Sequence, residues 1–104
     1  MRGIARFNFN ELCNQNLGGE DYIEIANCCH FITIENIPNF NNENADMQQR
    51  FITLIDIFYE KKIPLLISSN FKPNELNSAD RLKQPFKRTI SRIYELTSPE
   101  IKIV

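Results

Sequence analysis

Hydrophobic and polar positions follow two different periods along the chain, and the changes of period predict the elements. Residues 4–10, IARFNFN, alternate between apolar and polar side chains, which predicts a half-buried strand at a sheet edge. In residues 20–29 apolar side chains recur at i, i+3, i+4 and i+7, which predicts a short amphipathic helix. The run HFITIENIP is rich in β-forming residues and ends in a proline, so it predicts a buried strand over 31–35.

The second half of the chain repeats this change of period. One apolar stripe at helical spacing predicts a helix over 45–61. The run IPLLISS then predicts a buried strand over 63–67 at the centre of the sheet, with Pro64 at its start. Residues 77–85 are polar and contain a proline, which predicts a mobile loop, and 86–96 again show helical spacing. The last residues, SPEIKIV, predict a frayed tail or a short strand.

Strands and helices therefore alternate, and this order is typical of α/β proteins. It predicts a small, mainly parallel sheet with flanking helices and right-handed crossovers. The 104 residues suffice for one unit, so we expect 1–104 to form a single α/β domain or domain fragment. Ligands of such sheets gather at the carboxyl ends of the strands. Those ends carry Glu35-Asn36 and Ser68-Ser69-Asn70.

The composition narrows the class of protein. The chain is 42% hydrophobic and 24% charged, as is usual for globular proteins. No window approaches 18 apolar residues and the first residues lack an apolar signal core, so we expect neither a membrane span nor a secretory signal. The three cysteines, Cys13, Cys28 and Cys29, are odd in number and fit no common zinc spacing. We expect all three to be small buried hydrophobic side chains in a reducing compartment.

Charge is unevenly distributed, although the net charge is only −1. Basic residues collect at 81–92, which predicts a solvated helix face or, alternatively, an edge that contacts phosphate or nucleic acid. Arg88 and Arg92 are one helical turn apart and can face one anion together. On the preceding helix, Arg50 is expected to pair with Asp46, four residues earlier.

A site that hydrolyses a nucleotide needs a phosphate cradle, a carboxylate for Mg²⁺, a polar sensor and often an arginine. The sequence offers Glu35 as the carboxylate and Asn70 as a sensor-like polar tip. Arg88 and Arg92 are candidates to contact nucleotide or a neighbouring subunit. The cradle motif G-x-x-x-x-G-K-S/T is absent from the 104 residues. ATP binding by this chain alone is therefore expected to be very weak.

Several phrases carry a family likeness. They are, in order, ARFNFNELC, LGGEDY, a strand ending in IP, RFITLIDIFY and RTISRIYEL. Together they resemble the C-terminal part of the ZapE-type (AFG-like, lactation-elevated) P-loop ATPases, which are related to AAA+ proteins. The resemblance covers nearly the whole chain and implies part of a P-loop, RecA-like domain.

The resemblance implies a fragment of an ATP-binding and ATP-hydrolysing enzyme whose Walker A and Walker B motifs lie upstream of the matching region. ATP and Mg²⁺ are implied for the full-length family, and no cofactor is expected for the isolated chain. An N-terminal ATPase half or other subunits are the implied partners. Bacterial members act in cell division and mitochondrial members in protein quality control, which implies a cytoplasmic location for a bacterial-type protein.

Two other classes of function remain open from the sequence. The first is a non-enzymatic remnant or interaction module that docks a partner through the edge strand 4–10. The second and weaker one is nucleic-acid binding through Lys87, Arg88 and Arg92.

Overall fold

The computed structural model describes residues 3–14, 17–69, 71–72 and 75–97. Its sheet has three parallel strands in the order β1-β2-β3, with the bounds β1 (Gly3–Asn8), β2 (Cys29–Ile37) and β3 (Leu65–Ser69). The predicted α/β class and parallel sheet are confirmed. The predicted final strand or tail, 98–104, and the candidate Asn70 lie outside the described residues.

Helices fill the connections between the strands. They are α1 (Phe9–Cys13) and α2 (Gly19–Cys28) before β2, η1 (Asn42–Asn44) and α3 (Ala45–Glu60) before β3, and η3 (Asp80–Leu82) and α4 (Lys83–Leu96) after it. The three longer helices predicted from the sequence are therefore confirmed to within a few residues at their ends. Pro85 lies in the first turn of α4, where proline is tolerated.

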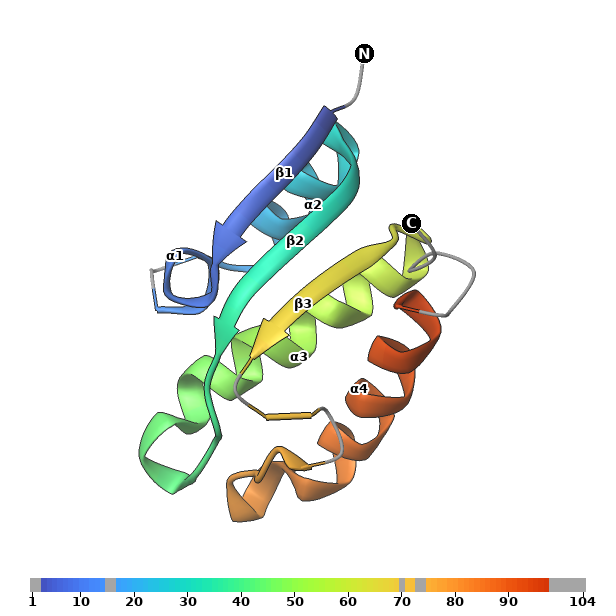
Figure 1. The fold of residues 1–104 in the computed structure, drawn as a ribbon. Helices are drawn as coiled ribbons and strands as arrows, with labels where there is room; N and C mark the ends of the chain where they lie inside the picture. Colours follow the sequence, from blue (N-terminus) through green and yellow to red (C-terminus); the bar gives the residue numbers. More distant parts are fainter. Residues whose placement is uncertain (1–2, 15–16, 70, 73–74, 98–104) are drawn as a thin grey trace.

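All the helices of the described chain lie on one side of the sheet. Each strand is placed beside the one before it, and right-handed crossovers that progress in one direction put their helices on the same face. Figure 1 shows α2 and α3 behind the strands, while α4 packs beside α3. The opposite face carries no helix from the residues that the structure describes.

The core lies between the sheet and this helix layer. It contains a cluster of four phenylalanines, Phe9, Phe40, Phe51 and Phe86, whose neighbouring ring centroids are 5.5 to 5.7 Å apart. The four rings join α1, the segment after β2, α3 and α4. Aromatic contacts of this kind stabilise by about 0.5–1.5 kcal/mol per pair beyond the burial of area.

The first strand ends earlier than the alternation predicted. The predicted strand over 4–10 stops at Asn8, because Asn8 is the N-cap of α1. The Asn8 side chain accepts from the backbone N–H of Asn10, and the Glu11 carboxylate accepts from the backbone N–H of Asn8 at 2.7 Å. This capping box turns Phe9 into the core.

The segment 77–85, predicted to be a mobile loop, is instead anchored to α3. Gln48 is fully buried, donates to Oγ of Ser78 at 2.7 Å and accepts from the backbone N–H of Ala79 at 2.9 Å. Asn42 holds the next residue, since it accepts from the backbone N–H of Asp80. The prediction was wrong because the polar side chain that holds the segment belongs to a different helix.

The strand β3 was predicted at the centre of the sheet, and this was wrong. Among the described strands it lies at one edge, β2 is central and β1 forms the other edge. Leu66 is 49% exposed, although the apolar run suggested a strand buried on both faces. Pro64 does precede the strand, and its carbonyl accepts from the backbone N–H of Ile32.

The cysteines divide into two kinds. Cys13 and Cys29 are buried, as predicted, whereas Cys28 is exposed at the end of α2. Burial raises the pKa of the Cys13 thiol to about 12 and also raises the pKa of Cys29. The two buried thiols are therefore protonated at neutral pH and are poor nucleophiles.

Candidate functional site

The two candidate arginines of α4 meet at one carboxylate of α3. Arg92 donates to Oδ1 of Asp56 at 2.5 Å, and the guanidinium of Arg88 lies 3.6 Å from Oδ2 of the same residue. The Arg92 side chain is 23% exposed and that of Arg88 is 60% exposed. The two arginines face one anion together, as their spacing allows, and in the structure that anion is the carboxylate of Asp56.

An aromatic ring completes this cluster. The guanidinium carbon of Arg92 lies 4.5 Å from the centroid of the Tyr59 ring, a cation–π contact. The Tyr59 hydroxyl lies 3.2 Å from a carboxylate oxygen of Glu95 and donates to it. We call Asp56, Tyr59, Arg88, Arg92 and Glu95 the α3–α4 charge cluster. It joins two helices that run side by side in the same direction.

The cluster is remote from the carboxyl ends of the strands. The helix α3 begins after β2 ends and runs back toward the start of β3, and Asp56 lies in its last third. At 1.5 Å per residue, Asp56 is about 16 Å along the helix from its first residue. The cluster is thus nearer to the amino ends of the strands than to the edge where ligands of parallel sheets gather.

Glu35 lies near the carboxyl end of β2 and is engaged by an arginine. Its Oε2 accepts from Nε and Nη2 of Arg6 on β1, at 2.9 and 2.6 Å. This hydrogen bond, together with the charge of the carboxylate, raises the pKa of Arg6. Within the described ranges, no three His, Cys, Asp or Glu side chains are grouped so as to hold a metal.

Asn70 falls between described residues, but its neighbour Ser69 shows what this end of β3 does. The Ser69 hydroxyl donates to the carbonyl of Ile37 at 2.6 Å and accepts from the backbone N–H of Phe71. Ser69 therefore ties the carboxyl ends of β2 and β3 together. The same end of β2 contains Asn36 at φ 63°, a left-handed conformation that asparagine tolerates well, where the strand register shifts.

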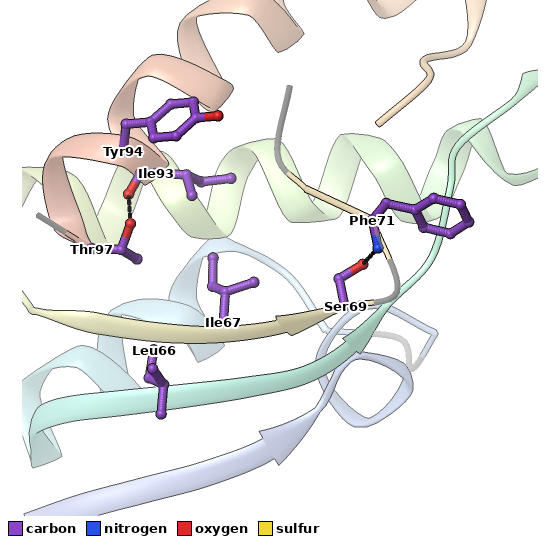
Figure 2. A pocket seen from close by; sticks show the side chains of 7 residues that line it. All are labelled: Leu66, Ile67, Ser69, Phe71, Ile93, Tyr94 and Thr97. Carbon is purple, nitrogen blue, oxygen red and sulfur yellow. Dashed lines mark hydrogen bonds between the residues drawn. The ribbon is translucent and has the colours of Figure 1, made fainter. Parts of the chain in front are cut away.

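A groove lies between β3 and the last turns of α4. It is lined by Leu66, Ile67, Ser69, Phe71, Ile93, Tyr94 and Thr97. In Figure 2, Ile67 points toward α4 and Leu66 points to the other side of the strand. Among the described residues that line this groove, none is charged.

Several residues of the family phrases have structural roles. The buried Tyr22 donates to the carbonyl of Leu12 at 2.7 Å, and Arg50 donates to the carbonyl of Cys13 at 3.1 Å. The sequence predicted that Arg50 pairs with Asp46, and this is wrong. Arg50 turns toward the end of α1 instead. Burial raises the pKa of Tyr22 to about 12. These contacts hold α1 against α2 and α3.

The sequence patterns did not single out Asp56, Tyr59 and Glu95 of the α3–α4 charge cluster, nor Arg6 as the partner of Glu35. Asp56 and Tyr59 lie one turn apart on a single face of α3. This spacing is the signal that could have shown that both residues contact the same side chains of a neighbouring helix.

Comparison with known sequences places the chain in a family. A sequence model of the AFG1-like ATPases matches residues 1–103. The chain is a member of the AFG1-like ATPase family, and the resemblance inferred from its motifs is confirmed. No helix among the described residues combines the length and apolar character needed to cross a membrane.

Among its relatives is the cell division protein ZapE of Escherichia coli K12, which is 33% identical over 92 residues, covering 88% of this chain and 24% of ZapE. The zebrafish lactation elevated protein 1 homolog B is 44% identical over 64 residues, covering 62% of this chain and 13% of that protein. The chain thus spans a quarter or less of the length of these relatives. No solved structure matches it.

Proposed function

We propose that this chain is the C-terminal segment of an AFG1-like ATPase and that it does not bind or hydrolyse ATP without the rest of that enzyme. The family match, together with the absence of a phosphate-cradle motif from the 104 residues, carries this proposal. In this view residues 1–104 form one α/β unit of a larger nucleotide-binding domain. The Walker A and Walker B motifs belong to the part that the chain does not include.

The described residues do not fit ATP and Mg²⁺ by themselves. Glu35 is held by Arg6, and the arginine pair is held by Asp56. No reaction step is therefore assigned to this chain. ATP and Mg²⁺ remain part of the proposal for the assembled ATPase, where Arg88, the more exposed of the two arginines, is the better placed to reach a nucleotide or a neighbouring subunit.

We also propose a biological role and a location for this chain. The Escherichia coli relative is a cell division protein, and we extend cell division and a cytoplasmic location to this chain on that basis. Its partners would be an N-terminal ATPase half or other subunits of the ATPase.

Two preparations test the proposal. The isolated chain, titrated with ATP and Mg²⁺ by calorimetry, is expected to show no binding in the micromolar range. A chimera in which this chain replaces the aligned 92 residues of ZapE is expected to hydrolyse ATP. Arg88→Met should lower hydrolysis by the chimera, while Arg81→Met serves as the matched control, because Arg81 is an equally exposed arginine paired with Asp46. Micromolar binding by the isolated chain would overturn the proposal.

The alternative is a non-enzymatic interaction module. One observation favours it: among the described strands β1 lies at an edge, as predicted, and Ile4 on it is 72% exposed. An inactive but folded chimera would support this alternative.

A further inference from the structure

The side of the sheet turned away from the helices has its own set of side chains. We call this surface the open face and define it by Ile4, Arg6, Phe31, Thr33, Glu35 and Leu66. Successive side chains of a strand point to opposite faces, and the buried neighbours Ile32, Ile34 and Leu65 point toward the helices. The strand register joins the open-face residues into rows, since Ile4 pairs with Phe31 and Thr33 pairs with Leu66.

The open face is apolar where it is most exposed. Ile4 is 72% exposed and Leu66 is 49% exposed, and they flank the half-buried Phe31 and Thr33 of the central strand. The charges of Arg6 and Glu35 neutralise each other. Exposed apolar groups gathered on one surface, without an unpaired charge, mark a protein contact more than a phosphate site.

Strand order explains why the described helices do not cover the open face. Parallel sheets occur almost only with helices on both faces. Here both crossovers progress in the same direction, so right-handedness places α2 and α3 on one face. Helices for the other face must come from sequence outside the described part of the chain.

We propose that the open face is a docking surface for helices from the rest of the AFG1-like ATPase, the three quarters of ZapE length that have no counterpart in this chain. This inference rests on the proposed function. The length of the missing part argues for this occupant, because the chain accounts for only 24% of ZapE. The chemistry of the surface agrees, since an amphipathic helix would lay its apolar stripe across Ile4, Phe31 and Leu66.

The test uses the intact chain and, as the probe, ZapE from which the aligned 92 residues have been removed. The two are mixed, and binding is measured by calorimetry. We expect a dissociation constant below about 1 μM, as for interfaces of large apolar area. Leu66→Lys combined with Ile4→Lys should weaken binding by about a hundredfold, because two charges would be buried against apolar helices.

The matched control is Ile23→Lys. Ile23 is 41% exposed and lies on α2, in the helix layer, so its replacement should change affinity by less than about twofold. Thermal unfolding of each isolated variant checks that it folds. Leu66→Thr provides a milder change, since threonine suits a strand, and it should weaken binding by about tenfold.

Every outcome bears on the proposal. Equal weakening by Ile23→Lys, or no weakening by the open-face variants, would overturn it, as would no complex at all. A dimer of the chain that Leu66→Lys dissociates, without binding to the probe, would assign the open face to a second copy instead.

ATP hydrolysis in the same mixtures separates the docking surface from the proposed function. A complex that depends on Leu66 but is inactive leaves the docking surface intact and contradicts the proposed function, whereas activity insensitive to Leu66→Lys contradicts the docking surface alone.

Discussion

Arg92 on α4 and Asp56 on α3 are joined by a charged hydrogen bond between two helices of the same layer. Both side chains are less than one third exposed, so water screens the pair only in part. We expect Asp56→Asn, which keeps the shape and removes the charge, to lower the free energy of unfolding by about 1–2 kcal/mol. Urea denaturation of the isolated chain measures this.

The control for that prediction is Asp46→Asn on the same helix. Asp46 is 89% exposed and lies 3.5 Å from Arg81, so its loss should change stability by less than about 0.5 kcal/mol. Equal losses for the two variants would show that the α3–α4 charge cluster contributes no more than an ordinary surface ion pair.

The end of α3 offers a stabilising substitution. Lys62 has φ 55°, and the backbone N–H groups of Lys62 and Ile63 donate to the carbonyls of Tyr59 and Phe58. This is a Schellman ending, whose left-handed residue is usually glycine. We expect Lys62→Gly to raise the free energy of unfolding by about 0.5–1 kcal/mol, because the left-handed strain of a residue with a side chain is removed.

Lys61→Gly is the companion variant. Lys61 has φ −88°, so glycine relieves no strain there and only enlarges the conformational freedom of the unfolded chain. Thermal unfolding should rank Lys62→Gly above the unchanged chain and Lys61→Gly below it. The reverse order would contradict the Schellman assignment.

Gln48→Ala should release the segment after β3. The backbone N–H of Ala79 would lose its buried acceptor, and Ser78 would lose its donor. We expect a loss of about 2–3 kcal/mol and faster hydrogen exchange at the amide of Ala79. Gln49→Ala, at the exposed neighbouring position, should leave that amide protected.

The exposed and buried thiols should differ in their reactivity, and the burial of Cys13 should make stability depend on pH. At pH 8 a thiol reagent should modify Cys28 in the folded chain and reach Cys13 only on unfolding. The folded pKa of Cys13 is raised from its ordinary value of 9.0 to about 12, so the unfolded state releases this proton first. The associated stability is fully present below pH 9 and falls as the pH rises toward 12. The pKa of Tyr22 is also raised in the folded state, from 10.0 to about 12, so its contribution to stability falls as the pH rises through this range.

A pH titration of the free energy of unfolding checks this dependence. Cys13→Ala should remove the part of the decline above pH 9 that comes from Cys13. Rapid modification of Cys13 in the folded chain would contradict its burial.

Local patterns predicted the helices and strands well because each depends on its own residues. The stripe of α3 and the alternation of β1 follow from which side chains face the core. The end of β1 was missed, although Asn8 and Glu11 form a capping-box signature three residues apart. The anchoring of Ser78 and Ala79 could not be read locally, because Gln48 lies thirty residues earlier.

The candidate site was predictable only in part. The spacing of Arg88 and Arg92 allows them to face one anion, but which anion they contact depends on how α3 and α4 pack. The run of β3 was predicted to be a buried central strand because it is apolar on both faces. Within the described residues only one face of the strand is covered, and Leu66 on the other face is exposed.

The agreement between strand order and chain order also bears on how the protein folds. Asn8 pairs with Glu35 and Ile32 pairs with Leu65, so each strand pair closes across a single helical connection. Parallel pairing across a whole helical connection is a non-local contact, so its loop-closure entropy must be met before the strands pair, and this slows folding. During synthesis, β1, α2 and β2 can associate before α4 has left the ribosome, so the apolar surface of the growing sheet is presented to chaperones early.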